Sequence, residues 1–202
     1  MSNLQPIEFY FDLSSPYSYL ASDWIEKLAA RYGRRVQWHA ILLGATFAVA
    51  QLKPLTAHPL KGEYALIDFA RSARFGGLKF VKPETFPIAT QNAARLFWWL
   101  ESQDPLKAAD WAKRCFAAYF AEGQILSDTA VLRALASQTG LDADTCENAW
   151  ATPLWKAKLK QENDAAIAKG VFGAPFFRID DEPFWGNDRR QQMERWLAEG
   201  PY

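Results

Sequence analysis

The chain has 202 residues, half of them hydrophobic, and its 23 basic side chains balance its 23 acidic ones. A chain of this length buries most of the apolar surface of its unfolded state, which predicts a well-packed globular protein. The zero net charge argues against nucleic acid as the main partner, because phosphate binding requires an excess of basic residues.

The first 43 residues predict a strand, a helix and a second strand. Successive side chains of residues 7–13 would point to opposite faces of a strand. Aromatic residues are frequent in this segment, which also indicates a strand. Ser14-Ser15-Pro16 then offers a favoured N-cap and a favoured first residue for a helix that runs to about residue 31 and ends before Gly33. Residues 36–42 indicate a second strand, and this order favours a parallel pair.

From Gly44 to about Lys169 the pattern is almost wholly helical, and prolines mark the boundaries between helices. Ser127-Asp128-Thr129 is a suitable N-cap for one of them. The sequence has no internal repeat and no low-complexity stretch. The predicted helices span residues 61–76, 88–102, 105–121, 127–139, 142–150 and 153–169.

The pattern of a sheet returns after the last of these helices. Residues 175–180 indicate a strand, Asp181-Glu182 a tight turn, and residues 183–185 a short second strand. Residues 187–198 indicate a final amphipathic helix.

Together these elements predict an α/β protein with the thioredoxin arrangement, interrupted by a large all-helical insertion. In this interpretation residues 1–43 and 170–202 form a thioredoxin-like domain, and residues 44–169 form the helical insertion domain. Most of the 9 Trp and 14 Phe residues are needed for the core, and a minority could line a pocket for a flat ligand.

The two cysteines and the N-terminal segment indicate a reducing compartment. Cys115 and Cys146 are too far apart for a Cys-x-x-Cys pair and lie in predicted helices, which favours two buried structural thiols. The N-terminal residues MSNLQPIEFYFDL have no basic segment and no long apolar run, so no signal peptide is predicted. No window approaches the run of about 20 apolar residues that spans a membrane. We expect a cytoplasmic protein without a membrane partner or a metal site.

Ser15-Pro16-Tyr17-Ser18 lies where a thioredoxin-type protein carries its nucleophile, at the first turn of the helix after the first strand. Free N–H groups and the helix dipole stabilise an anion there and lower the pKa of a cysteine. The segment resembles Cys-Pro-x-Cys with serine at both cysteine positions, which excludes disulfide exchange at this site. A thiolate brought by a ligand could occupy the same position, although Ser-Pro is more often only a helix cap.

Two later segments are candidates for the same site. In a thioredoxin-like fold Pro175 would be cis and would face the helix N-terminus, with the backbone of Ala174 free to pair with a peptide-like ligand. Trp185-Gly186-Asn187-Asp188 leads from the last strand into the last helix. Asn187 or Asp188 is expected to cap that helix. The same two side chains could hold an α-amino-acid group of a ligand. Asp188 would pair with the ammonium of that group, and Asn187 would bind its carboxylate.

Five runs carry a resemblance that extends nearly end to end: FYFDLSSPYSYLA, AILLG, KGEYALIDFAR, GVFGAPFF and FWGNDR. Together they resemble the 2-hydroxychromene-2-carboxylate isomerases, which are DsbA-like proteins closely related to the kappa-class glutathione transferases. The resemblance implies a DsbA-like fold, glutathione as a bound cofactor and a glutathione-dependent isomerisation. The family reaction interconverts a cyclic hemiketal carboxylate and an open-chain trans-benzylidenepyruvate, and reversible addition of a thiolate to the conjugated carbon is one route to it.

The resemblance also implies roles for individual residues. Ser15 would match the catalytic serine that stabilises the glutathione thiolate. Ala174, next to Pro175, would match the residue whose backbone pairs with the cysteinyl unit. The γ-glutamyl end would be held by Trp185, Gly186, Asn187 and Asp188.

The substrate, an aromatic carboxylate, would bind in the helical insertion. The basic residues that bind this carboxylate in naphthalene-pathway members correspond here to Phe47, Thr56 and Thr90. The nearby cations that could replace them are Lys53, Lys61, Arg71 and Arg74. Lys61 is also expected as a solvated residue at a helix start, and Tyr64 as a partly buried ring. The substrate-binding residues expected on this basis are Phe47, Lys53, Lys61 and Tyr64.

Three further polar residues have structural interpretations. Asp12, at the end of the first strand, could tune a thiolate, but hydrogen bonding to the following turn is the simpler use. His39 on a strand and His58 in a proline-flanked loop have no adjacent nucleophile and are poor catalytic candidates.

Two other functions fit the same residues. A kappa-like glutathione transferase or peroxidase would use the same thiolate on an electrophile. A non-catalytic thioredoxin-like binding protein would use the cleft for extended peptides. A homodimer is compatible with the resemblance, but the sequence indicates no interface.

Overall fold

The computed structural model describes residues 4–202, and within them one sheet has the strands β1 (Ile7–Phe11), β2 (Val36–Ala40), β3 (Phe176–Ile179) and β4 (Glu182–Trp185). Residues 1–3, which belong to the segment predicted to lack a signal peptide, lie outside the described residues. The strand order is β2-β1-β3-β4. β1 runs parallel to β2, which confirms the prediction, and antiparallel to β3, which pairs antiparallel with β4.

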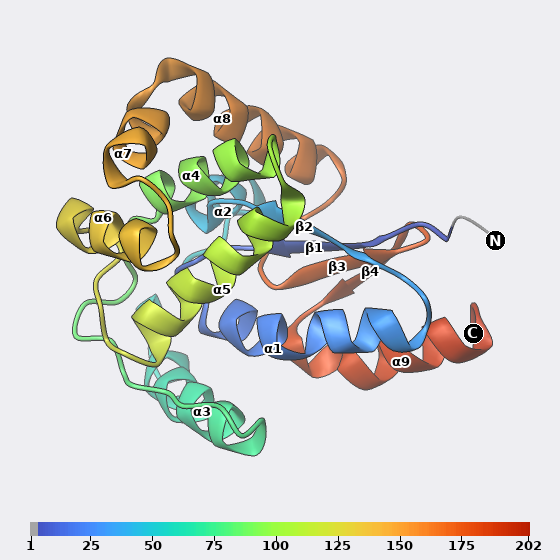
Figure 1. Ribbon diagram of the computed structural model, residues 1–202. Coiled ribbons are helices and arrows are strands. Elements are labelled where there is room, and N and C mark those ends of the chain that lie inside the picture. The colour runs from blue at the N-terminus through green and yellow to red at the C-terminus, as the bar shows by residue number, and fades with distance from the viewer. Residues whose placement is uncertain (1–3) are drawn as a thin grey trace.

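Helices cover both faces of this sheet (Figure 1). In the described chain they are α1 (Pro16–Arg31), α2 (Leu43–Ala50), α3 (Lys61–Phe75), α4 (Gln91–Glu101), α5 (Pro105–Phe120), α6 (Thr129–Gln138), α7 (Ala143–Ala151), α8 (Pro153–Ala168) and α9 (Arg190–Glu199), with the 3₁₀ turns η1 (Leu55–Ala57) and η2 (Asn187–Arg189). α1 and α9 lie side by side on one face, and an ion pair of 2.7 Å joins Arg31 to Glu194 between them. α8 lies over the opposite face.

Alternate side chains of β1 pack in two different hydrophobic cores, one on each face of the sheet. Phe9 points toward α1 and stacks on Phe177 with ring centroids 5.2 Å apart. Tyr10 points the other way and packs in a smaller cluster with Ala166 of α8 and Phe176. This alternation is the one predicted from the sequence, and it places apolar surface of the sheet under helices on each side.

The larger core continues from the sheet into the helices that follow β2. Phe11 at the end of β1 contacts Phe97 of α4 and Phe116 of α5, with centroids 5.3 and 5.6 Å apart. Helices α4 and α5 are therefore packed on the end of the sheet. The thioredoxin-like fold with a helical insertion is confirmed, whereas the division into domains at residues 44 and 170 stays a prediction.

Several helix ends are those the sequence predicts. Ser15 is the N-cap of α1, with Pro16 as the first helical residue, and Gly33 follows its C-terminus with a φ of 66°. The Asp128 carboxylate accepts the N–H of Ala130 at 2.8 Å and caps α6. Side-chain oxygens at these positions satisfy N–H groups that have no partner within the helix.

Four local predictions were wrong. Helix α2 was not predicted at all, and α4 begins at Gln91 instead of residue 88. The turn between the last strands is centred on Asp180 and Asp181, both with positive φ, so Glu182 already belongs to β4. The predicted helix 187–198 begins as a 3₁₀ turn and becomes α-helical only at Arg190.

The two cysteines are free and buried, as predicted, on α5 and α7. Burial raises the pKa of the Cys146 thiol to about 11, and it raises the pKa of Cys115 further. Neither thiol is therefore a nucleophile near neutral pH. Among residues 4–202, no helix combines the length and the apolar character needed to cross a bilayer.

Candidate active site at the first turn of helix α1

The Ser15 hydroxyl lies between the start of α1 and the loop before β3. Its oxygen accepts the N–H of Ser18 at 3.2 Å, and the hydroxyl donates to the carbonyl oxygen of Ala174 at 3.1 Å. The backbone N–H of Ser15 donates to the backbone carbonyl oxygen of Asp12 at 2.9 Å. Ser15 is thus both a helix cap and the link between two segments far apart in the sequence.

The first turn of α1 keeps one free backbone donor. Pro16 has no N–H, and the N–H of Ser18 is bound by Ser15, but the N–H of Tyr17 has no partner within residues 4–202. The positive end of the helix dipole lies at the same place. An anion beside Ser15 would therefore meet a hydroxyl, an unpaired N–H and a favourable dipole.

The second serine of the tetrapeptide differs from the first. The Ser18 side chain is fully buried, and its hydroxyl oxygen has no hydrogen-bond partner in the described part of the chain. Of the two cysteine positions, only the one occupied by Ser15 therefore carries a hydroxyl with partners at the helix N-terminus.

Asp12 is used to hold the backbone around the site. Its carboxylate accepts the N–H of Ser14 and the N–H of Leu43, both at 2.7 Å, and the hydroxyl of Thr90 at 3.1 Å. Burial raises the pKa of the Asp12 carboxyl above its ordinary value, and these hydrogen bonds oppose the rise. These contacts confirm the structural interpretation of Asp12. They also show that Thr90, expected near the substrate, is buried against this carboxylate.

The loop before β3 faces the helix as predicted. The Ala174-Pro175 peptide bond is cis, and the N–H of Ala174 makes no hydrogen bond within the described residues. Gly173 lies under the indole ring of Trp185, where an added Cβ would stand 2.5 Å from Nε1. Trp185 also packs on the ring of Phe172, with centroids 4.9 Å apart. Gly173 is therefore required for the present position of this half-exposed tryptophan.

The Gly186–Asp188 turn is tied to both the loop and α1. The N–H of Gly186 donates to the Pro175 carbonyl at 3.0 Å, and the Trp24 indole donates to the Asn187 side-chain oxygen at 2.8 Å. Asp188 is mostly exposed and pairs with Arg189 at 3.0 Å. Neither Asn187 nor Asp188 caps the last helix, so that prediction was wrong. Asn187 is used instead to join the turn to α1.

Tyr17 connects the tetrapeptide to α3. Its hydroxyl donates to the Asp68 carboxylate at 2.5 Å, and Ser72 donates to the same oxygen at 3.3 Å. Burial raises the pKa of Tyr17 well above its usual range, and the charges of Asp68, Tyr64 and Asp188 add to the effect. Tyr17 therefore joins the tetrapeptide directly to α3.

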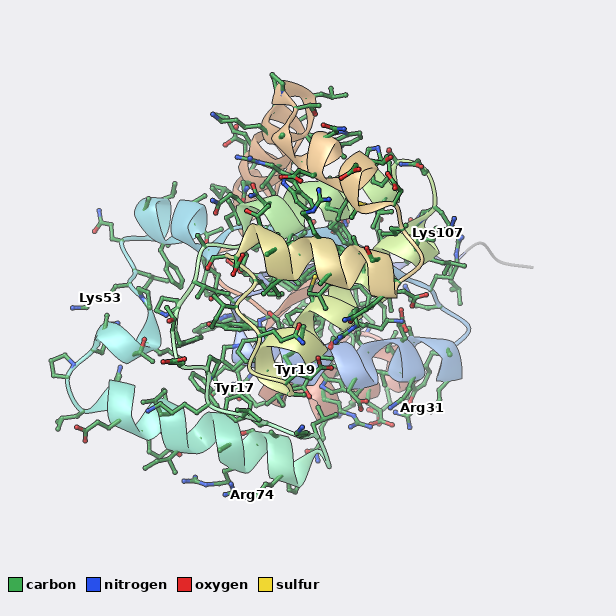
Figure 2. The ribbon with its side chains drawn as sticks, turned by 60° about the vertical axis from the view of Figure 1, so that its left-hand side comes forward. Tyr17, Tyr19, Arg31, Lys53, Arg74 and Lys107 are labelled. Carbon is green, nitrogen blue, oxygen red and sulfur yellow. The ribbon has the colours of Figure 1, made fainter. Side chains whose placement is uncertain are left out.

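The residues predicted to bind substrate lie on α2, on α3 and in the segment between these helices. Phe47 is half-buried on α2, and Lys61 and Tyr64 are exposed on α3. Lys53 and Arg74 project away from the body of the molecule (Figure 2). Lys61 is a solvated residue at a helix start, as expected, whereas Tyr64 is more exposed than predicted and carries Arg71 over its ring. No hydrogen bond or ion pair in residues 4–202 joins any of these residues to Ser15.

Sequence reasoning missed three contributors to the site: Trp24, Tyr17 and Asp68. Trp24 fits the core by its helical spacing, and nothing in the sequence shows that its indole N–H has a polar partner so far along the chain. Tyr17 carried a usable signal, because it lies inside the Ser15–Ser18 segment. Asp68 lies in the KGEYALIDFAR run, but nothing in that run identifies its partner.

The sequence from residue 6 to residue 198 matches the family described as DSBA-like thioredoxin domain. The 2-hydroxychromene-2-carboxylate isomerase of Pseudomonas putida is 32% identical over 191 residues, covering 93% of this chain and 92% of the relative. Glutathione s-transferase kappa 2 of Caenorhabditis elegans is 25% identical and covers 98% and 94%. A solved structure of a 2-hydroxychromene-2-carboxylate isomerase superposes with a TM-score of 0.86 at 28% identity, covering 95% of this chain and 94% of the other.

These matches extend over nearly the whole chain, and they include the helical insertion as well as the sheet. They agree with the family that the sequence resembles. The chain belongs to the DsbA-like thioredoxin family and, within it, to the family of the 2-hydroxychromene-2-carboxylate isomerases.

Proposed function

We propose that the protein is a glutathione-dependent isomerase that acts on 2-hydroxychromene-2-carboxylate or on a closely related conjugated aromatic acid. The observation that carries the proposal is the Ser15 hydroxyl, held at the N-terminus of α1 and facing the carbonyl of Ala174. Membership of the isomerase family supports the reaction, and the kappa-class relative supports glutathione as the thiol.

The unpaired donors at the site fit glutathione. The Tyr17 N–H is available to a thiolate, and the Ala174 N–H is available to a peptide carbonyl beside it. Neither of these N–H groups has a partner within residues 4–202. A tripeptide with a central cysteine offers the matching acceptors, since the thiolate and the backbone carbonyl belong to the same cysteinyl residue.

Bound glutathione would supply a thiolate nucleophile for reversible addition to the conjugated carbon of the substrate. The Ser15 hydroxyl would stabilise that thiolate by turning its proton from the Ala174 carbonyl to the sulfur. The Ser18 N–H would remain on the Ser15 oxygen and hold it in position. Donors fixed before the reaction stabilise a charge without reorganisation, which is why this arrangement favours the anionic form.

The turn after β4 would hold the γ-glutamyl end. Asp188 is exposed, and its partner Arg189 follows it directly in the chain, so the carboxylate is free to exchange that partner for an ammonium group. Asn187 is less free, because its side-chain oxygen already accepts the Trp24 indole N–H. Trp185 would cover the peptide from the loop side. The aromatic carboxylate would lie toward α2 and α3, where Phe47, Lys53, Lys61 and Tyr64 remain the proposed substrate contacts.

A turnover assay tests this function directly. The hemiketal acid is offered with and without glutathione, beside a chlorinated aromatic electrophile as the transferase substrate. Isomerisation that requires glutathione and exceeds conjugation is the expected result. Faster conjugation would favour a kappa-like transferase, and turnover without glutathione would contradict the proposal. Failure to bind glutathione in calorimetry, together with binding of an extended peptide, would favour a non-catalytic binding protein.

A further inference from the structure

Three helices begin at one buried carboxylate. Asp12 directly follows β1 and is 5% exposed. Its carboxylate binds the N–H of Ser14, which precedes the cap of α1, and the N–H of Leu43, the first residue of α2. It also accepts the hydroxyl of Thr90, the N-cap residue of α4. The N-termini of α1, α2 and α4 therefore meet at this side chain.

This convergence explains how the Asp12 carboxylate is stabilised without a cation. Burial and hydrogen bonds govern its pKa, and no basic side chain in the described chain contributes to it. Each helix N-terminus carries roughly half a positive elementary charge. Three such ends and three hydrogen-bond donors surround the carboxylate and take the place of a basic partner.

Helix α2 depends on this contact more than the other two helices do. It has eight residues, its N-cap residue Leu42 supplies no side-chain hydrogen bond, and Thr46 is its one buried residue. An isolated helix of this length is marginal in water. The position of α2 must therefore be fixed by contacts from outside the helix.

A second buried side chain binds the neighbouring N–H group. Asn163 of α8 is 4% exposed, and its side-chain oxygen accepts the N–H of Leu42 at 2.8 Å. Its amide group donates to the Leu159 carbonyl at 2.8 Å, which fixes the orientation of the amide. The Leu43–Asp12 and Leu42–Asn163 hydrogen bonds are the two anchors of α2. They come from different elements, so together they fix both the position and the direction of the helix start.

We infer that Asp12 and Asn163 are positioning residues that set α2 against the first turn of α1. The inference rests on the proposed function, in which α2 contributes a substrate contact through Phe47. Phe47 lies about one helical turn beyond the anchored Leu43. The turn held by Asp12 leads directly into Ser15. The two anchors therefore determine where the substrate lies relative to the thiolate that Ser15 would stabilise.

Asp12→Asn tests the first anchor with almost no change in shape. Its amide oxygen can replace the carboxylate oxygen that binds both Ser14 and Thr90, which turns the NH₂ group toward the N–H of Leu43. We expect the KM for the aromatic acid to rise at least fivefold. The affinity for glutathione should stay equal or become tighter, because a negative charge near the thiolate is removed.

Asn163→Leu removes the second anchor and leaves the Asp12 carboxylate in place. We expect a KM for the acid at least threefold higher, with kcat and the glutathione dissociation constant within twofold of wild type. Hydrogen exchange should become faster in residues 43–50 than in residues 16–31 in both variants. This readout requires neither substrate nor glutathione.

Asp128→Ala is the matched control for loss of a helix cap. Asp128 accepts the N–H of Ala130 at 2.8 Å and caps α6, which carries none of the proposed site residues. This variant should be less stable, with the KM and the exchange of residues 43–50 unchanged. A rise in KM equal to that of the two anchor variants would show that general destabilisation is sufficient, and would overturn the inference.

The other outcomes separate the inference from the proposed function. Unchanged exchange of residues 43–50 in both anchor variants would overturn the anchoring of α2. Equal losses of acid binding and glutathione binding in both variants would overturn the specific role toward the substrate. A wild type without glutathione-dependent turnover would overturn the proposed function, and the exchange measurement would still decide whether the two anchors hold α2.

Discussion

Ser15 and Ser18 have the same side chain and lie on the same helical turn, yet their surroundings differ. Ser15 accepts one hydrogen bond and donates another, whereas the Ser18 hydroxyl is buried without a partner in the described chain. We predict that Ser15→Ala lowers kcat/KM by about 10²–10³-fold, the usual loss of one preorganised donor. It should also cost about 1 kcal/mol of unfolding free energy through the lost cap.

Ser18→Ala is the matched control for that variant. Removing a buried hydroxyl that has no partner should leave the unfolding free energy equal or slightly higher, and turnover should stay within about twofold of wild type. Steady-state kinetics at saturating glutathione and urea unfolding measure both variants. Equal losses of activity in the two variants would contradict the separate roles of these serines.

Gly173 sets the position of Trp185. In Gly173→Ala the new methyl group would collide with the indole Nε1, so Trp185 must leave the loop. We predict at least tenfold weaker glutathione binding in calorimetry and a changed tryptophan emission spectrum. Gly44→Ala is the control, since a Cβ there meets nothing within 4 Å and alanine favours the helix. Unchanged affinity in Gly173→Ala would remove Trp185 from the proposed cofactor site.

Helix α3 is joined to the first turn of α1 by the hydrogen bond from Tyr17 to Asp68. We predict that Tyr17→Phe costs about 1–2 kcal/mol, because it leaves a half-buried carboxylate short of a donor. Hydrogen exchange should become faster in residues 61–75 but not in α4 or α5. Tyr32→Phe, at the other end of α1, is the control, because the Tyr32 hydroxyl makes no hydrogen bond in the described chain. Uniform acceleration across the molecule would contradict a local tether.

Most elements could be predicted from the sequence because their signals are local. The alternation of β1, the Ser15-Pro16 start of α1 and the Asp128 cap of α6 all depend on residues within one or two turns. Helix α2 could not be found this way. Its residues LGATFAVA have no local cap, and the Leu43 N–H is bound by Asp12, which comes from the end of β1. A cap supplied by a distant segment cannot be recognised in the sequence of the helix that it stabilises.

The candidate site was predictable to a similar degree. Its three segments were found because each combines a turn with a distinctive residue, and the structure brings Ser15 and Ala174 into contact. The cap assigned to Asn187 was wrong because the Trp24 indole takes that side-chain oxygen. The turn at Asp180-Asp181 was misplaced by one residue. The predicted strand starts at Pro183, although Glu182 already pairs with Ile179.

At the scale of the whole molecule, we predict that acid stability depends on His39. It stacks on Tyr10 at 4.5 Å, its Nε2 is buried without a partner in the described chain, and burial lowers its pKa to about 4. The unfolded chain takes up this proton near the ordinary pKa of about 6.5, before the folded chain does. The stability that His39 contributes is therefore full above pH 6.5 and is lost as the pH falls toward 4, by about 2–3 kcal/mol.

His39→Phe keeps the ring stacking and removes the titration. Urea unfolding between pH 7 and pH 4 should show a smaller loss of unfolding free energy in this variant than in the wild type. The Asp12 carboxyl, whose pKa is raised by burial, acts in the opposite direction in both proteins and cancels in the comparison. Parallel pH profiles for the two proteins would show that His39 does not govern acid unfolding.

The fold supplies a helix N-terminus, a cis-proline loop and the Gly186–Asp188 turn, and both cysteines lie elsewhere, on α5 and α7. We propose that Ser15 stabilises the thiolate of bound glutathione. An ultraviolet titration of thiolate absorbance, with wild type and Ser15→Ala each saturated with glutathione, measures this directly. We predict that the bound thiol titrates at least one pH unit below free glutathione in the wild type and returns toward the free value in Ser15→Ala. A bound thiol with the same pKa in both proteins would contradict the claim.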